Sequence, residues 1–214
     1  MQPSVAESWT TITQWLKQHV PSAYDALQPP ASFRGIAAVR SGMGRRLPSD
    51  LVAWLNLNNG FEPRGGFGNI LPVLFTPWPC EDMLRRREMW RQVYAGHDRP
   101  GDDQPAGTSS AAWLDSFLPI GDAFTDVELF VDLRDGDLYG CVGQFDSESG
   151  FDLPRWFSVA EMLADVADAL TLDQPALQDH GRRSHAAAPY WTPHAWHPYV
   201  DDGRLRWNLV DLDS

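Results

Sequence analysis

Hydrophobic positions recur at helical spacing in several parts of the chain. Residues 4–20 place Trp9, Ile12 and Leu16 on one face. Ser4 and Glu7 stand three residues apart at the start of this segment, which is the spacing of a capping box. The same periodicity occurs in four further segments: 33–44, 47–60, 81–96 and 157–170. The pattern therefore predicts at least five amphipathic helices.

Residues 127–133 alternate with period two, which predicts a β-strand. The dipeptide Asp135-Gly136 predicts a type I′ hairpin turn, and this register would pair Leu129 with Val142. One face of the hairpin would then be aliphatic, and the other would carry Glu128, Phe130, Asp132, Tyr139 and Cys141. A further strand is predicted for residues 69–75.

The second face of this hairpin contains the candidate partner-binding residues. We expect helices to cover the aliphatic face, which leaves the second face toward solvent. Aromatic side chains supply contact area at interfaces, and carboxylates select a basic partner. In the alternative arrangement, Trp191, Trp196 or Trp207 packs over this face. The candidate residues are Glu128, Phe130, Asp132 and Tyr139.

The last part of the chain differs from the rest in composition. Residues 173–214 read as a linker followed by an aromatic-rich extension with a second hairpin signal at Asp202-Gly203. Its aromatic side chains require burial, so we expect it to dock on the body formed by residues 1–172.

Composition and charge limit the function classes. The chain holds 29 acidic and 17 basic residues, a net charge of −12, which disfavours nucleic acid and acidic membranes and favours a basic protein partner. Cys80 and Cys141 are far apart in the sequence and are expected to be reduced thiols. The N-terminus has no signal pattern, and no apolar run is long enough to span a bilayer. We therefore expect a cytoplasmic location.

Known catalytic and metal-binding patterns do not match this sequence. The acidic residues of segment 118–146 lack calcium-loop spacing, and Glu128 and Asp132 would lie ~13 Å apart on one strand. His194 and His197 lie between prolines, which resist the helix that a metal-binding HxxH pair needs. Residues 85–87, three consecutive arginines, are interpreted as a solvated helix face. We expect no catalytic residues, no metal and no cofactor.

Two motifs in order resemble the SMI1/KNR4 family of the SUKH superfamily. They are "LPSDLVAWLNLNNG", residues 47–60, and "LPIGDAFTDVELFVDLRDGDLYGCV", residues 118–142. The resemblance extends from Trp9 to Leu172, and the aromatic tail is outside the family pattern. It implies an α+β domain with helices packed on a mostly antiparallel, curved sheet, and it brings no catalytic residues.

The resemblance also implies a role in protein binding. Many bacterial members look like immunity proteins that neutralise polymorphic toxins, so the first hypothesis is toxin neutralisation. The alternative is a regulatory or scaffold module, related to cell-wall assembly or signalling, without a toxin partner. A third hypothesis is an enzyme whose site is dispersed along the sequence. The oligomeric state stays open.

Overall fold

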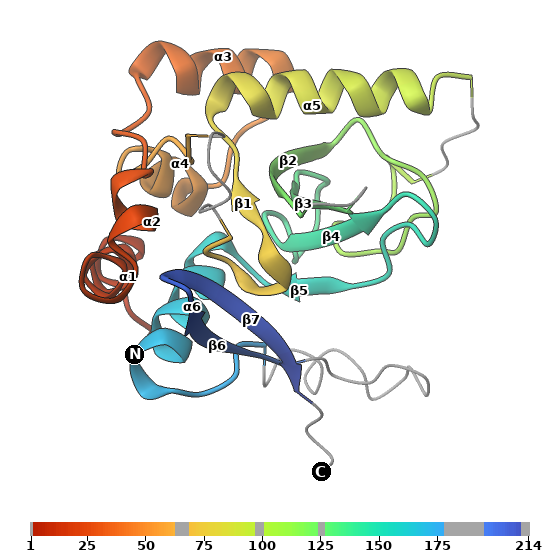
Figure 1. The fold of residues 1–214 in the computed structure, drawn as a ribbon. Coiled ribbons are helices and arrows are strands. Elements are labelled where there is room, and N and C mark those ends of the chain that lie inside the picture. The colour runs from red at the N-terminus through yellow and green to blue at the C-terminus, as the bar shows by residue number, and fades with distance from the viewer. Residues whose placement is uncertain (1, 63–68, 97–100, 124–126, 178–194, 211–214) are drawn as a thin grey trace.

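The computed structural model describes residues 2–62, 69–96, 101–123, 127–177 and 195–210, in which helices pack on an antiparallel sheet (Figure 1). The helices are α1 (Val5–His19), α2 (Pro21–Asp25), α3 (Phe33–Met43), α4 (Ser49–Leu55), the 3-10 turn η1 (Pro72–Leu74), α5 (Cys80–Val93) and α6 (Val159–Leu172). The strands are β1 (Thr76–Pro77), β2 (Phe117–Asp122), β3 (Val127–Asp132), β4 (Val142–Asp146), β5 (Pro154–Trp156), β6 (Ala195–Asp201) and β7 (Arg204–Val210).

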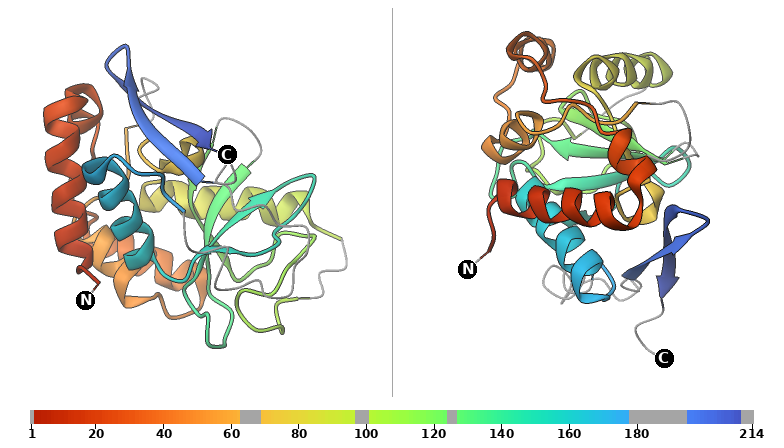
Figure 2. Two further views of the ribbon diagram at one scale, coloured as in Figure 1. Left: turned by 90° about the horizontal axis from the view of Figure 1, so that it is seen from below. Right: turned by 60° about the vertical axis from the view of Figure 1, so that its left-hand side comes forward.

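The central sheet has the order β1-β2-β3-β4-β5, and every neighbouring pair is antiparallel. The predicted α+β class, with helices on a mostly antiparallel sheet, is therefore confirmed. Helices α1 and α6 lie side by side (Figure 2). Within the described residues, no helix has the length and apolar character needed to cross a bilayer.

The helix starts follow from the capping residues. The Ser4 hydroxyl accepts the N–H of Glu7, and the Glu7 carboxylate accepts the N–H of Ser4, so the predicted capping box is present. At α6, Ser158 accepts the N–H of Glu161 in the same way. The Glu161 carboxylate, however, accepts the N–H of Phe157, one residue earlier than a capping box requires.

Two hydrophobic cores lie on opposite faces of the sheet. The larger core packs the aliphatic face of β2, β3 and β4, including Leu129, Val131 and Val142, against α1, α3, α4 and α6. The predicted burial of this aliphatic face is confirmed. The smaller core is aromatic, and its buried members are Trp90, Trp113, Leu114, Phe117, Phe130, Phe145 and Phe151.

The β3–β4 connection differs from the predicted turn. The observed register pairs Val131 with Val142 and Leu129 with Gln144, two residues away from the predicted pairing of Leu129 with Val142. The faces are unchanged because a shift of two residues preserves the alternation. Arg134 turns its side chain into the protein instead of continuing the ladder, so residues 133–141 form a longer connection.

Two other local predictions are wrong. Residues 69–75 form no strand, because Pro72 lacks an N–H and Val73 and Leu74 adopt positive φ angles of 67° and 74° that turn the chain back. The helical spacing of residues 33–44 places Phe33 on the same face as Ile36, Val39 and Met43, yet Phe33 is 86% exposed. It is the first residue of the helix, and the helix packs through Ile36 and later positions.

The C-terminal hairpin forms as its turn signal predicts. Asp201 pairs with Arg204 across Asp202 and Gly203, both of which have positive φ, as a type I′ turn requires. Trp207 is 4% exposed and packs in the larger core, and its indole N–H donates to the carbonyl of Asn69.

Candidate functional site

Glu128, the first candidate partner-binding residue, is completely buried. Its carboxylate accepts the indole N–H groups of Trp78, at 3.1 Å, and Trp90, at 2.9 Å. The Arg86 guanidinium donates to both carboxylate oxygens. The buried carboxylate therefore accepts hydrogen bonds from four N–H groups, which lie in α5 and in the residues before it. These bonds hold α5 against the sheet.

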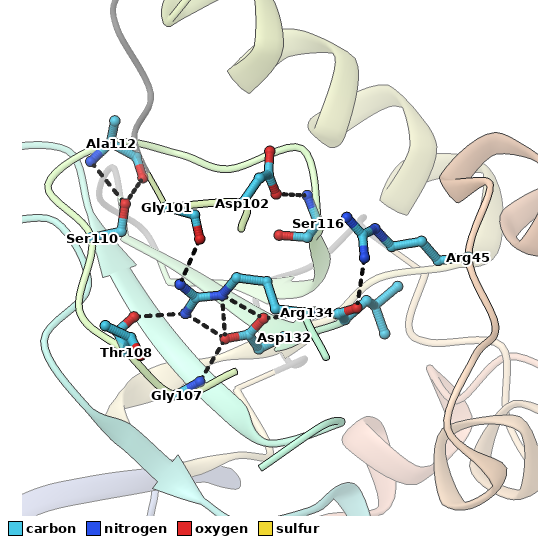
Figure 3. Close-up of polar contacts among 11 residues, drawn as sticks. Arg45, Gly101, Asp102, Gly107, Thr108, Ser110, Ala112, Ser116, Asp132 and Arg134 are labelled. Carbon is cyan, nitrogen blue, oxygen red and sulfur yellow. Dashed lines mark hydrogen bonds and ion pairs between the residues drawn. The ribbon is translucent and has the colours of Figure 1, made fainter. Parts of the chain in front are cut away.

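Asp132, the second candidate carboxylate, is buried in an ion pair with Arg134 (Figure 3). Arg134 Nη2 lies 2.7 Å from Asp132 Oδ2, and the guanidinium also donates to the carbonyls of Gly101 and Thr108. The N–H of Gly107 donates to Asp132 Oδ2. The pair thus ties the segment 101–116 to the end of β3.

Segment 101–116 and α5 together cover the face that was predicted to be open. Phe130 is buried between Phe117, at a ring-centroid distance of 4.0 Å, and Phe151, at 5.0 Å. The expectation that Glu128, Phe130 and Asp132 face solvent is wrong. Of the alternative covers, Trp207 lies in the larger core and Trp196 packs against that core, so neither covers these three residues, and Trp191 lies outside the described residues.

The interpretation of the three consecutive arginines also needs correction. Arg85 has a largely exposed side chain, as expected, and pairs with Asp82. Arg86 instead donates to buried Glu128, and Arg87 donates to the carbonyl of Asp115. The sequence carried no local sign of these partners, because Glu128 is 42 residues from Arg86.

Burial shifts the pKa values of two thiols and one carboxyl group in the fold. Burial is the main cause that raises the pKa of the Cys80 thiol to about 11, and burial likewise raises the pKa of Cys141. Both thiols stay protonated at neutral pH.

The carboxyl group of Asp122 is also affected by its surroundings: burial and, secondly, the charge of Glu128 raise its pKa to about 6. In the described part of the chain, no group of three or more His, Cys, Asp or Glu side chains is arranged to hold a metal ion.

Tyr139 is the one candidate residue at the surface. It is half-buried, its hydroxyl donates to the carbonyl of Arg46, and the Arg46 guanidinium lies 5.2 Å from its ring centre. These two residues border a depression of about 600 Å³, which we name the β3–β4 depression. Its lining consists of Arg45, Arg46, Leu133, Asp135, Gly136, Asp137 and Tyr139.

Two further depressions meet at Gln28, and we name them together the Gln28 surface. The first, of about 400 Å³, is lined by Trp9, Thr13, Tyr24, Asp25, Leu27, Gln28, Leu57 and Asn58. The second, of about 490 Å³, is lined by Gln28, Asn59, Phe61, Glu62, Pro79, Glu81, Asp82 and Arg85. Helices α1 and α2, the residues after α4 and the start of α5 contribute to it.

The two asparagines of the "NNG" sequence line different depressions, Asn58 the first and Asn59 the second. Asn58 Nδ2 donates to the carbonyl of Gln28, and Asn58 Oδ1 accepts the N–H of Gly60. Asn59 Oδ1 accepts the N–H of Cys80, the first residue of α5. Gly60 has a φ of 79°, and a Cβ there would lie 2.6 Å from the backbone carbonyl carbon of Trp78 and from the backbone nitrogen of Pro79. The helical periodicity of residues 47–60 gave no indication of these contacts.

Comparison with known proteins identifies the family. The family model described as "SMI1 / KNR4 family (SUKH-1)" matches residues 30–165, more than half of the chain. The protein belongs to the SMI1/KNR4 family. No curated protein matches the chain. SUKH proteins act in protein–protein interaction and include immunity proteins. The matched range contains the β3–β4 depression and most of the Gln28 surface, whereas β6 and β7 lie beyond it.

Proposed function

We propose that this SMI1/KNR4 protein is a non-enzymatic, cytoplasmic immunity protein that binds and neutralises a bacterial polymorphic toxin. The observation that carries the proposal is the family membership over residues 30–165, since this family includes immunity proteins.

The use of the carboxylates supports a binding role over catalysis. The carboxylates of Glu128 and Asp132 are enclosed and accept hydrogen bonds from indole, guanidinium and backbone N–H groups of the protein itself. A general acid or base must reach the substrate, and these two groups have no exposed surface. The two cysteines are protonated and buried. These observations favour a protein that acts through its surface.

The charge of the chain supports a basic partner. A net charge of −12 accelerates association with a cationic protein and repels nucleic acid. Toxin domains that act on nucleic acids need a basic surface for their substrate. An acidic immunity protein is electrostatically suited to such a domain.

Co-expression with the adjacent toxin gene tests the proposal. The toxin domain encoded next to the gene for this chain is induced in a bacterial host with and without the protein. We expect growth to be restored when both are present, and an inactive toxin variant to co-purify as a stoichiometric complex.

Two results would count against toxin neutralisation. One is toxicity that persists despite normal levels of folded protein, together with no complex on gel filtration. The other is a gene without any toxin-encoding neighbour, which would favour the regulatory or scaffold alternative.

A further inference from the structure

The two surface regions differ in charge. The lining of the Gln28 surface holds four carboxylates, those of Asp25, Glu62, Glu81 and Asp82, against the single guanidinium of Arg85. The lining of the β3–β4 depression holds two carboxylates against two guanidinium groups, so its charges balance. Charge complementarity with a basic partner therefore selects the Gln28 surface.

Three of the four carboxylates are available to a partner. Asp82 is buried and pairs with Arg85 at 2.8 Å. Asp25, Glu62 and Glu81 are exposed, and none of the three forms an ion pair with another described residue.

Apolar side chains lie between these charges. Trp9 and Phe61, which are almost fully buried, line the two depressions, and Leu57, which is 37% exposed, borders the first. Protein interfaces combine apolar contact area with charged margins in this way to hold an anchor side chain.

The backbone beneath the Gln28 surface is held by long-range hydrogen bonds. Residues 26–31 are joined to residues 55–62 through backbone bonds that include Gln28 N–H to Gly60 O and Glu62 N–H to Ala26 O. The Asn58 and Asn59 side chains add the bonds described above. A surface that is already ordered loses little conformational entropy on binding.

We propose that the Gln28 surface binds a cationic segment of the protein partner, in which a lysine or arginine pairs with Glu62 and Glu81 and a neighbouring apolar side chain contacts Leu57 and Trp9. This assignment deepens the proposed function, because it names the binding surface and the chemistry of the segment that it accepts.

A random peptide library provides a probe that does not depend on the toxin. The full chain is used as bait, and the affinity of enriched peptides is measured by fluorescence anisotropy. We expect lysine or arginine next to an aliphatic or aromatic residue in the enriched sequences, and binding that weakens with salt. An absence of enrichment, or enrichment of peptides without basic residues, would overturn the assignment.

Matched charge reversals locate the binding. The double variant Glu62→Lys/Glu81→Lys should weaken peptide binding about tenfold or more, and Glu62→Gln/Glu81→Gln should weaken it by a smaller factor. The control Asp135→Lys/Asp137→Lys makes the same charge change in the β3–β4 depression and should alter binding by about twofold at most. All of these side chains are exposed, so circular dichroism should show unchanged folds. Equal losses in both reversals, or a loss in the control alone, would contradict the proposal.

The toxin domain separates this assignment from the proposed function. If peptides bind as expected and no toxin is neutralised, the surface stands and the proposed function fails. If the protein neutralises the toxin, and the Asp135/Asp137 variant loses protection while the Glu62/Glu81 variant keeps it, the function stands and the surface assignment fails.

Discussion

Glu128 and Arg134 are charged side chains without exposed surface. Their burial is tolerated only because hydrogen-bond partners and opposite charges surround each of them. An ion loses several kcal/mol of hydration free energy on burial, and the loss is offset only when an opposite charge and hydrogen bonds replace the water. The Glu128 carboxylate accepts hydrogen bonds from two indole N–H groups and a guanidinium. The Arg134 guanidinium donates to the Asp132 carboxylate and to two backbone carbonyls. Each charge thereby joins segments that are distant in the sequence.

Removing the Arg134 guanidinium should destabilise the fold strongly. Arg134→Met leaves Asp132 buried without its counter-ion, so we expect the free energy of unfolding to fall by about 3–5 kcal/mol. Urea denaturation measures the change. The matched control is Arg91→Met, which removes an exposed pair with Asp115 and should cost about 1 kcal/mol or less. Equal effects of the two substitutions would show that the buried pair does not hold segment 101–116.

Asp122 should make the stability of the protein depend on pH. Its pKa in the folded protein is about 6, above its ordinary value of 3.8. The folded state therefore holds this proton more tightly than the unfolded state, and stability decreases as the pH rises from about 4 through 6.

Asp122→Asn removes this ionisation. The variant should gain stability over the parent at pH 8 and show little gain near pH 4, as measured by urea midpoints. Asp135→Asn, in an exposed turn, is the control and should change stability by about 0.5 kcal/mol at most. A gain that is the same at both pH values would mean that Asp122 does not ionise in this range.

At the level of the element, strand β3 is buried on both faces. Leu129 and Val131 enter the larger core, and Phe130 enters the aromatic core. Gly143 lies opposite Phe130 in β4, where a Cβ would come within 2.5 Å of the phenyl ring. A solvent-facing strand needs no such space, so this glycine reflects the second buried face.

A charge in the aliphatic face of β3 should disrupt folding. Val131 is completely buried, and Val131→Asp would place a carboxylate there without a partner. We expect a loss of about 3–5 kcal/mol in the free energy of unfolding. Thermal melting of this variant is compared with that of Val93→Asp, at a position that is 55% exposed on α5. A parental melting temperature for Val131→Asp would refute the strand register.

At the level of the whole molecule, packed side chains cover both faces of the central sheet. Aliphatic packing fills one face and an aromatic cluster the other, and the ion pairs Arg86–Glu128 and Arg134–Asp132 lie within the fold. The hairpin of β6 and β7 adds Leu205 and Trp207 to the larger core from outside the family-matched range.

Metal removal should leave the protein unchanged, as the lack of metal-ligand spacing in the sequence predicts. We expect the melting temperature and the circular dichroism spectrum to be the same before and after treatment with a chelator. Elemental analysis of the purified protein should detect no stoichiometric metal. One metal ion per chain, with a lower melting temperature after chelation, would contradict this prediction.

The sequence by itself determined the main helices, the period-two strand β3 and the turn at Asp202-Gly203. These signals are local, because a capping residue, a helical stripe or an alternating strand acts over a few neighbouring positions. It also determined that Leu129 and Val131 face the same core.

The tertiary structure alone decided what covers the second face of β3. Glu128, Phe130 and Asp132 follow the alternation of a solvated strand face, yet α5 and segment 101–116 enclose them. The hydrogen-bond partners of Glu128, namely Trp78, Trp90 and Arg86, lie 38 to 50 residues away from it. Local periodicity shows which positions share a face, but a buried charge and an exposed one look alike in sequence, because the difference lies in hydrogen-bond donors that only the folded chain brings together.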